Sequence, residues 1–177
     1  MEKSYKEYLQ HITTFVFDVD GVLTDGSIIV NTDGELFRTM NIKDGFALKT
    51  AVDRGFNVCI ISGGTNEGVR SRLNGLGITD IHLGTHQKTQ TLNDYLTSKN
   101  LNNENVLFMG DDIPDLDVMQ HVGLPCCPQD AVPEIKDISK YISHKKGGKG
   151  CVRDVIEQVL KVQGKWLDGQ GASAKYD

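Results

Sequence analysis

Short hydrophobic runs alternate along this chain with longer amphipathic stretches. Runs rich in β-branched and aromatic residues predict buried strands over 12–17, 56–61, 80–83, 105–109 and 123–127. Helical periodicity, with residues that cap or end helices, predicts helices over 44–54, 66–76, 87–99, 113–121 and 152–162. Strands that alternate with helices in this order form a parallel sheet with helices on both faces. We therefore expect an α/β fold built on a Rossmann-like, doubly wound parallel sheet.

Two segments depart from this alternation. Residues 27–30 and 35–40 are β-like arms on either side of a turn signal, Asn-Thr-Asp-Gly, and predict a projecting hairpin. After residue 162 the chain is rich in glycine and shows no periodicity. These patterns predict one domain over residues 1–162 and a flexible C-terminal tail over residues 163–177.

Composition narrows the class of protein. The 177 residues carry a net charge of −5, which argues against a general attraction to nucleic acid or to an anionic membrane. The basic segment 144–149 is short, with no stacking aromatic residue apart from Tyr141 nearby. No apolar stretch approaches the roughly 20 residues that span a bilayer, and the start lacks a signal-peptide core. The four cysteines form no C-x-x-C pair, so we expect reduced, buried thiols in a cytoplasmic protein without nucleic-acid or membrane partners.

Acidic residues gather directly after two of the predicted strands. Asp18 and Asp20 follow the first, and Asp111, Asp112 and Asp115 follow the fourth. Ligands bind at the carboxyl ends of strands in open α/β sheets. Two carboxylates about 4 Å apart repel by about 4 kcal/mol at an effective dielectric near 20, so such a cluster favours a divalent cation or raised pKa values. Oxygen ligands without a neighbouring thiolate or imidazole favour Mg²⁺.

Two further features fit a phosphate ligand. Ser62, Gly63 and Gly64 end another predicted strand with a hydroxyl and bare backbone amides, a suitable cradle for phosphoryl oxygens. Lys88 adds a compact cation at the start of a predicted helix. Each feature alone has an ordinary explanation, because aspartate and glycine are common at strand ends and most lysines lie on the surface. Their joint occurrence predicts a phosphate site.

Taken in order, these motifs resemble the four motifs of the haloacid dehalogenase superfamily of phosphotransferases: D-x-D-G, then Ser or Thr, then Lys, then G-D-D-x-x-D. The resemblance implies that Asp18 is the nucleophile and Asp20 the general acid and base. It assigns Ser62 and Lys88 to phosphate positioning. A carboxylate can attack a phosphate dianion only if the charge between them is cancelled, which Mg²⁺ and a lysine would do.

The same resemblance implies the metal ligands and the surroundings of the site. Asp18, Asp111 and the backbone carbonyl of Asp20 would hold the ion, with Asp112 and Asp115 in the outer shell. Many superfamily members cover the site with a cap domain, but the stretches between the motifs here are too short for one. A capless site is open to water, so we expect neighbouring subunits to cover it, with the 27–40 hairpin mediating assembly.

Finer motifs indicate one branch of the superfamily. D-x-D-G-V-L-T-D-G at 18–26, N-I-K-D-G at 41–45 and K-G-G-K-G-C-V-R-D at 146–154 resemble the 3-deoxy-D-manno-octulosonate 8-phosphate phosphatases, which are capless tetramers of lipopolysaccharide synthesis. The resemblance implies a homotetramer acting on a small phosphorylated sugar acid. The substrate-binding residues it implies are Asp20, Asn41, Lys43, Asp44, Gly45, Lys49, Gly63, Arg72 and Lys88.

The chain departs from that branch at three positions. Gly64 stands where many of these phosphatases carry arginine, and Lys43 and Lys49 stand where arginines are usual. Lysine cannot reproduce the fork that arginine offers a carboxylate. A keto-deoxynononate 9-phosphate phosphatase, another sugar or nucleotide phosphatase, and a non-catalytic oligomerisation module of the same fold are the alternatives. The presence of all four motifs argues against the last.

Overall fold

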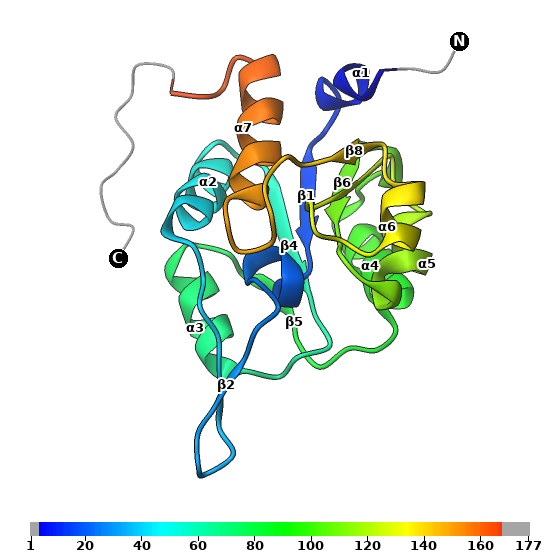
Figure 1. Ribbon diagram of the computed structural model, residues 1–177. Coiled ribbons are helices and arrows are strands. Elements are labelled where there is room, and N and C mark those ends of the chain that lie inside the picture. Colours follow the sequence, from blue (N-terminus) through cyan, green and yellow to red (C-terminus); the bar gives the residue numbers. More distant parts are fainter. Residues whose placement is uncertain (1–3, 168–177) are drawn as a thin grey trace.

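A six-stranded, fully parallel sheet forms the centre of the computed structural model, which describes residues 4–167 (Figure 1). The strand order is β5-β4-β1-β6-β7-β8. The strands are β1 (Thr14–Phe17), β4 (Asn57–Ile61), β5 (Asp80–His82), β6 (Val106–Met109), β7 (Leu124–Cys127) and β8 (Tyr141–Ile142). The predicted parallel α/β sheet is confirmed.

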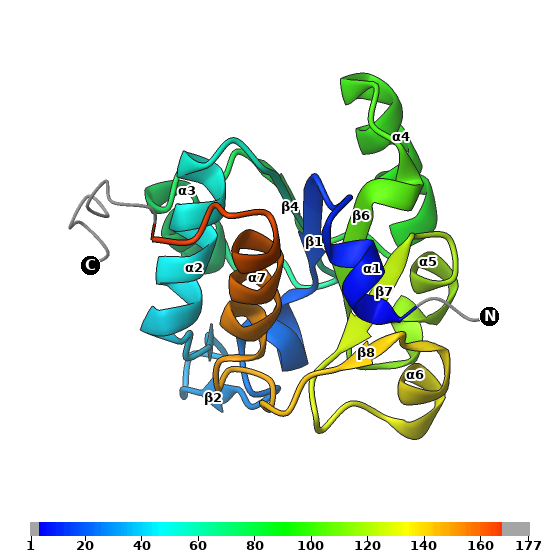
Figure 2. The same cartoon turned by 90° about the horizontal axis from the view of Figure 1, so that it is seen from above.

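Helices cover both faces of the sheet, as the view from above shows (Figure 2). One face carries α2 (Ile42–Asp53), α3 (Glu67–Gly75) and α7 (Cys151–Val162), and the other carries α4 (Lys88–Lys99), α5 (Leu116–Met119) and α6 (Pro133–Ile138). The central strand β1 serves both layers because its side chains alternate. Phe15 and Phe17 pack under α2 and α7, whereas Val16 packs under α4 and α5. The four cysteines are buried and unpaired, as expected.

Three elements were not foreseen from the pattern: α1 (Tyr5–Leu9), α6 and β8. They are five, six and two residues long, too short for a periodicity to show. The helix predicted over 113–121 is divided into a 3-10 turn, Ile113–Asp115, and the one-turn helix α5. Pro114 lies in the first turn of this segment, where its missing N–H costs no helical hydrogen bond.

The predicted hairpin consists of β2 (Ile29–Val30) and β3 (Leu36–Phe37), which pair antiparallel and project from the body (Figure 1). Between β1 and β4 the described chain holds only this hairpin, α2 and the connecting turns, which is too little for a cap domain. The hairpin exposes apolar side chains on an isolated two-stranded ribbon, an arrangement that is marginally stable in water. These side chains are Ile28, Ile29, Val30, Leu36 and Phe37.

The chain after α7 turns back onto the body. The Gln163 side-chain amide donates to the carbonyl oxygens of Leu9 and Ile12 at 2.9 and 2.8 Å. Trp166 meets Phe46 edge-on, with ring centroids 5.9 Å apart. The predicted tail thus begins with residues in contact with the domain, and residues 168–177 lie outside the described part of the chain. Within residues 4–167, no helix has the length and apolar character needed to cross a membrane.

Candidate active site

The turn that follows β1 is shaped by one aspartate and one glycine. The Asp18 backbone N–H donates to Met109 O at 3.1 Å, and its side chain accepts from Val19 N at 2.7 Å. Gly21 has φ +85°, and a Cβ at this position would lie 1.9 Å from Asp111 Oδ2. Glycine is therefore required twice here, for the left-handed backbone and for the close approach of Asp111.

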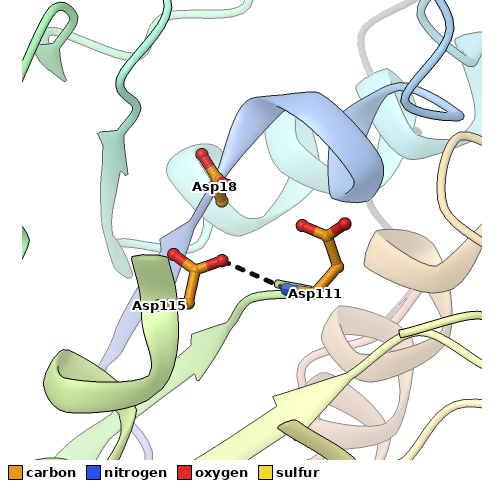
Figure 3. A group of neighbouring side chains, drawn as sticks. All are labelled: Asp18, Asp111 and Asp115. Carbon is orange, nitrogen blue, oxygen red and sulfur yellow. Dashed lines mark hydrogen bonds between the residues drawn. The ribbon is translucent and has the colours of Figure 1, made fainter. Parts of the chain in front are cut away.

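Three carboxylates converge at this edge of the sheet (Figure 3). Asp18, Asp111 and Asp115 each place one oxygen within 4.8 Å of the others, and Asp115 Oδ2 accepts from the Asp111 backbone N–H at 3.1 Å. Lys88 Nζ lies between two of them, 3.1 Å from Asp18 Oδ2 and 2.7 Å from Asp115 Oδ1. The lysine side chain is only 6% exposed, so the cation is enclosed with its partners.

Two of these carboxyl groups have strongly raised pKa values. Burial raises the pKa of Asp18 to about 7, the charge of Asp115 adds to the rise, and Lys88 opposes it. Burial, followed by the charges of Asp18 and Asp115, raises the pKa of Asp111 to about 8. For Lys88, burial acts to lower the pKa, but the two paired carboxylates outweigh it and the net shift is upward. Convergent oxygens with surplus negative charge fit a hard divalent cation.

These side chains open into a cavity of about 370 Å³. It is lined by Asp18, Asp20, Gly21, Gly26, Ser62, Gly63, Gly64, Thr85, His86, Lys88, Asp111, Asp112, Pro114 and Asp115. Ser62 is 2% exposed, and its Oγ accepts from Gly64 N at 3.2 Å. The four predicted motifs therefore meet in one cavity. A larger cavity of about 780 Å³ near α1 contains no comparable cluster of carboxylates around a buried lysine.

Asp20 lies at the side of the cavity and is held by a residue that the sequence analysis missed. Arg38, directly after β3, donates from Nε to Asp20 Oδ1 at 2.6 Å and from Nη2 to Oδ2 at 3.1 Å. The sequence contains no signal for this contact, because it depends on how the hairpin folds back over the turn. Asp112 accepts from its neighbour Ile113 N at 2.8 Å and stays outside the three-carboxylate group.

Three of the expected substrate-binding residues, Asp20, Gly63 and Lys88, line the cavity. Within residues 4–167, the other six do not line it; they lie on α2 or α3 or at the end of α2. Asn41 caps α2 by accepting from Lys43 N at 2.8 Å. Asp44 is 1% exposed and accepts from Arg153 N at 2.8 Å in the first turn of α7. Burial raises the pKa of Asp44 to about 6, and its bonds to α7 oppose the rise.

The other four residues of that set lie on α2 and α3, where the Lys43 side chain is exposed. Lys49 pairs with Asp53 one turn further along α2. A Cβ on Gly45 would lie 2.7 Å from Arg72 Nη2, so the glycine leaves room for the guanidinium of α3 to lie against α2.

A glycine pair, Gly147 and Gly148, from the distant loop before α7 packs against the turn that follows β1. Gly148 N donates to Val22 O at 2.9 Å. A Cβ on Gly147 would lie 1.9 Å from Gly21 O, and one on Gly148 would lie 2.6 Å from Asp25 N. The basic segment around these glycines is thus packed against the turn that carries Asp18 and Asp20.

Comparison with known proteins agrees with this geometry. Residues 74–156 match the model of the haloacid dehalogenase-like hydrolase family. The chain is 35% identical over 164 residues to the 3-deoxy-D-manno-octulosonate 8-phosphate phosphatase KdsC of Salmonella typhi, covering 93% of this chain and 87% of the relative.

Solved structures extend the similarity to the fold. A crystal structure of the Yersinia pestis 3-deoxy-D-manno-octulosonate 8-phosphate phosphatase superposes with a TM-score of 0.90 at 32% identity, covering 93% of this chain and 89% of that one. The Moraxella catarrhalis phosphatase, in complex with magnesium ion, phosphate ion and a KDO molecule, gives a TM-score of 0.88 at 32% identity, covering 90% and 92%. The chain belongs to the haloacid dehalogenase-like hydrolases, in the family of the 3-deoxy-D-manno-octulosonate 8-phosphate phosphatases.

Proposed function

We propose that this protein is a Mg²⁺-dependent phosphatase that hydrolyses 3-deoxy-D-manno-octulosonate 8-phosphate to KDO and phosphate, a step in lipopolysaccharide precursor synthesis. The observation that carries the proposal is the group of Asp18, Asp111 and Asp115 around the buried Lys88, in a cavity shared with Asp20 and Ser62. The Salmonella typhi and Moraxella catarrhalis relatives support the choice of substrate.

In the first step, Asp18 attacks phosphorus and forms an aspartyl-phosphate, while the bond from phosphorus to the substrate oxygen breaks. Ser62 and Lys88 hold the phosphoryl oxygens in line with the carboxylate. Asp18, Asp111 and the backbone carbonyl of Asp20 would bind Mg²⁺, with Asp112 and Asp115 outside them, and the ion supplies the charge neutralisation that lets an anion approach a phosphate.

Asp20 moves the protons. In its protonated form it donates to the leaving oxygen, so that the sugar departs as an alcohol. In its ionised form it then accepts a proton from water, whose oxygen attacks the phosphorus of the aspartyl-phosphate. That second attack releases inorganic phosphate and restores the Asp18 carboxylate, so one water is consumed for each ester cleaved.

The active form is a cytoplasmic homotetramer in this proposal. The apolar side chains exposed on the hairpin, Ile28, Ile29, Val30, Leu36 and Phe37, form a surface that a second copy would cover. The neighbour would also bring surfaces such as the one with Lys43, Lys49 and Arg72 towards the open cavity. Light scattering on the active enzyme tests assembly, and a fully active monomer would contradict it.

A panel of phosphate esters tests the reaction and its specificity. It contains 3-deoxy-D-manno-octulosonate 8-phosphate, keto-deoxynononate 9-phosphate, simple hexose phosphates and nucleoside monophosphates, each with Mg²⁺ and with EDTA. We expect the highest kcat/KM for the eight-carbon ester, no phosphate release in EDTA, and no activity for Asp18→Asn. Equal rates across the panel would refute the proposed specificity. A higher kcat/KM for the nine-carbon ester would identify that ester, and not the eight-carbon one, as the substrate. Absence of any Mg²⁺-dependent release would leave the non-catalytic module as the correct interpretation.

A further inference from the structure

We propose that Arg38 is a positioning residue, which fixes the side-chain carboxylate of Asp20 in the orientation needed for proton transfer to the leaving oxygen. The inference rests on the proposed phosphatase reaction and adds to it a component carried by the hairpin. It concerns the side chain of Asp20 and leaves the role of its backbone carbonyl untouched.

The contact has the geometry of an orienting clamp. Arg38 uses two different nitrogens, Nε and Nη2, on the two different oxygens of Asp20, at 2.6 and 3.1 Å. A bidentate pair of this kind fixes both the position and the rotation of a carboxylate plane, which a single contact cannot do. The arginine side chain is 10% exposed, whereas that of Asp20 is 38% exposed. Asp20 is therefore held on one side and accessible on the other.

Arg38 contacts the Asp20 carboxylate from outside the cavity. Asp20 lines the cavity that contains Asp18 and Lys88, but Arg38 does not. Arg38 instead lines a narrow space, together with Asp20 and Asn66, that has no room for a water molecule. It is thus placed to act through Asp20, because it contacts that carboxylate without lining the cavity where the phosphate would bind.

The surroundings of the guanidinium keep this place free for it. A Cβ on Gly64 would lie 3.3 Å from Asp20 Oδ2 and 3.5 Å from Arg38 Nη2. A methyl group at position 64 would therefore touch both partners, and a longer side chain would need space beside them. The absence of a side chain at Gly64 thus leaves room for the contact between Arg38 and Asp20.

The strand that precedes Arg38, β3, is joined to α3 by a side-chain hydrogen bond. The Asn66 side chain donates from Nδ2 to Leu36 O at 2.8 Å and accepts from Val69 N at 3.0 Å, where it caps α3. One side chain thus joins β3 to the helix that begins just after the Ser62–Gly64 segment. Arg38 follows two residues after this tie, so its position depends on the base of the hairpin and not on the tip.

A positioning role and a purely structural ion pair predict different kinetics. An alkyl phosphate needs a proton on its leaving oxygen, so its cleavage depends on where Asp20 lies. An aryl ester such as p-nitrophenyl phosphate releases a stable phenolate, and its first phosphoryl transfer needs no proton. Loss of the clamp should therefore slow the alkyl ester selectively, whereas general damage to the site would slow both.

The test compares Arg38→Met and Arg38→Lys with wild type in first-turnover and steady-state assays at saturating Mg²⁺. The substrates are 3-deoxy-D-manno-octulosonate 8-phosphate and p-nitrophenyl phosphate. For Arg38→Met we expect roughly a tenfold to hundredfold fall in kcat on the alkyl ester with KM changed less than about threefold. The first-turnover release of nitrophenol should stay within about threefold of wild type. Arg38→Lys, which keeps one donor, should recover part of the lost kcat.

Arg70→Met is the matched control, because Arg70 also pairs with a carboxylate, Glu67, and bonds Ile81 O at 2.9 Å, but does not line the cavity. It should behave as wild type on both esters. An equal fall on both esters for Arg38→Met, a loss confined to KM, or unchanged kcat would each overturn the positioning role. If the wild-type protein releases no phosphate from either ester, the proposed function fails. If the wild type is active and Arg38→Met is equally active, only the positioning role fails.

Discussion

Asp18 and Asp20 lie two residues apart in one turn, yet different parts of the molecule hold them. Asp18 faces the sheet edge, where the buried Lys88 of α4 lies 3.1 Å from its Oδ2. Asp20 faces the hairpin, where Arg38 reaches it from β3. The first pair is nearly enclosed, with side chains 11% and 6% exposed, whereas the Asp20 side chain is 38% exposed.

The difference matches the work each carboxylate would do. A nucleophile must stay in line with phosphorus, and the sheet and α4 are the least mobile supports in such a fold. A group that delivers and then takes back a proton must face two partners in turn, a sugar oxygen and a water molecule. The arginine that pairs with Asp20 comes instead from the base of the hairpin, which Asn66 joins to α3. The turn thus carries one carboxylate held by α4 beside the sheet and one held by the hairpin.

The largest effect should come from removing the enclosed cation. Lys88→Met leaves Asp18 and Asp115 without their shared partner, and breaking a buried pair in this way typically costs about 3–5 kcal/mol of unfolding free energy. We expect kcat to fall by a factor of about 10²–10³ as well. Urea unfolding in EDTA and phosphate release in Mg²⁺ measure the two effects.

The matched control is Lys99→Met at the other end of α4, where the lysine pairs with Asp80 at 2.6 Å and is 38% exposed. A surface pair of this kind contributes at most about 1 kcal/mol, and kcat should not change. Similar losses for the two variants would contradict the distinction between enclosed and exposed cations.

The next effect concerns pH and metal. The folded pKa values of Asp18, about 7, and Asp111, about 8, exceed the ordinary value of 3.8. Their protonated forms therefore favour folding, and this contribution, complete below about pH 4, is lost as pH rises through 7 and 8. Mg²⁺ binds the ionised forms, so its stabilisation should grow over the same interval.

Urea unfolding from pH 5 to pH 8.5, with EDTA and with Mg²⁺, measures this contribution. Asp44 also has a raised pKa, but near 6, so the slope between pH 6.5 and pH 8 reports the metal site. Asp111→Asn should flatten that slope in EDTA and weaken the response to Mg²⁺. A metal-free stability that rises across this interval would show that the cluster is not strained by its own charge.

The smallest effect should come from loosening the hydrogen bond that holds the base of the hairpin. Asn66→Asp keeps the acceptor that caps α3 but removes the donor to Leu36 O. We expect kcat on the alkyl ester to fall a few-fold, in the same substrate-dependent pattern as for Arg38→Met, with little change in unfolding free energy. Asn102→Asp, at a cap remote from the site, should leave both unchanged. A fall that is equal for alkyl and aryl esters would mean that Asn66 serves only α3.

Much of the fold follows from local pattern, because a buried parallel strand is a compact apolar run and its flanking helices end at glycines. The pattern is silent where elements are short: β8 has two residues and joins the sheet only because β7 offers a free edge beside it. Similarly, α1 has five residues, of which Leu9 alone is buried, so no apolar stripe marks it.

The residues of the site likewise divide into those that the local sequence pattern could place and those that it could not. Asp18, Ser62 and Asp111 could be placed together because each follows a parallel strand, and parallel strands end at one edge. Arg38 could not, since its contact depends on the path of a hairpin that no periodicity describes. Asp44 shows the same limit: its motif resembles a substrate-contacting segment, whereas its buried carboxylate bonds the start of α7, over a hundred positions later in the chain.

The glycine pair at 147 and 148 has a consequence for how this protein can change. A methyl group at either position would meet the backbone of the catalytic turn at 1.9 to 2.6 Å, although neither glycine carries a reactive atom. In a saturation library scored for growth or turnover, these two positions should therefore tolerate as few replacements as Asp18. Engineers who wish to reshape the basic loop for new ligands should leave them in place and vary the lysines on either side.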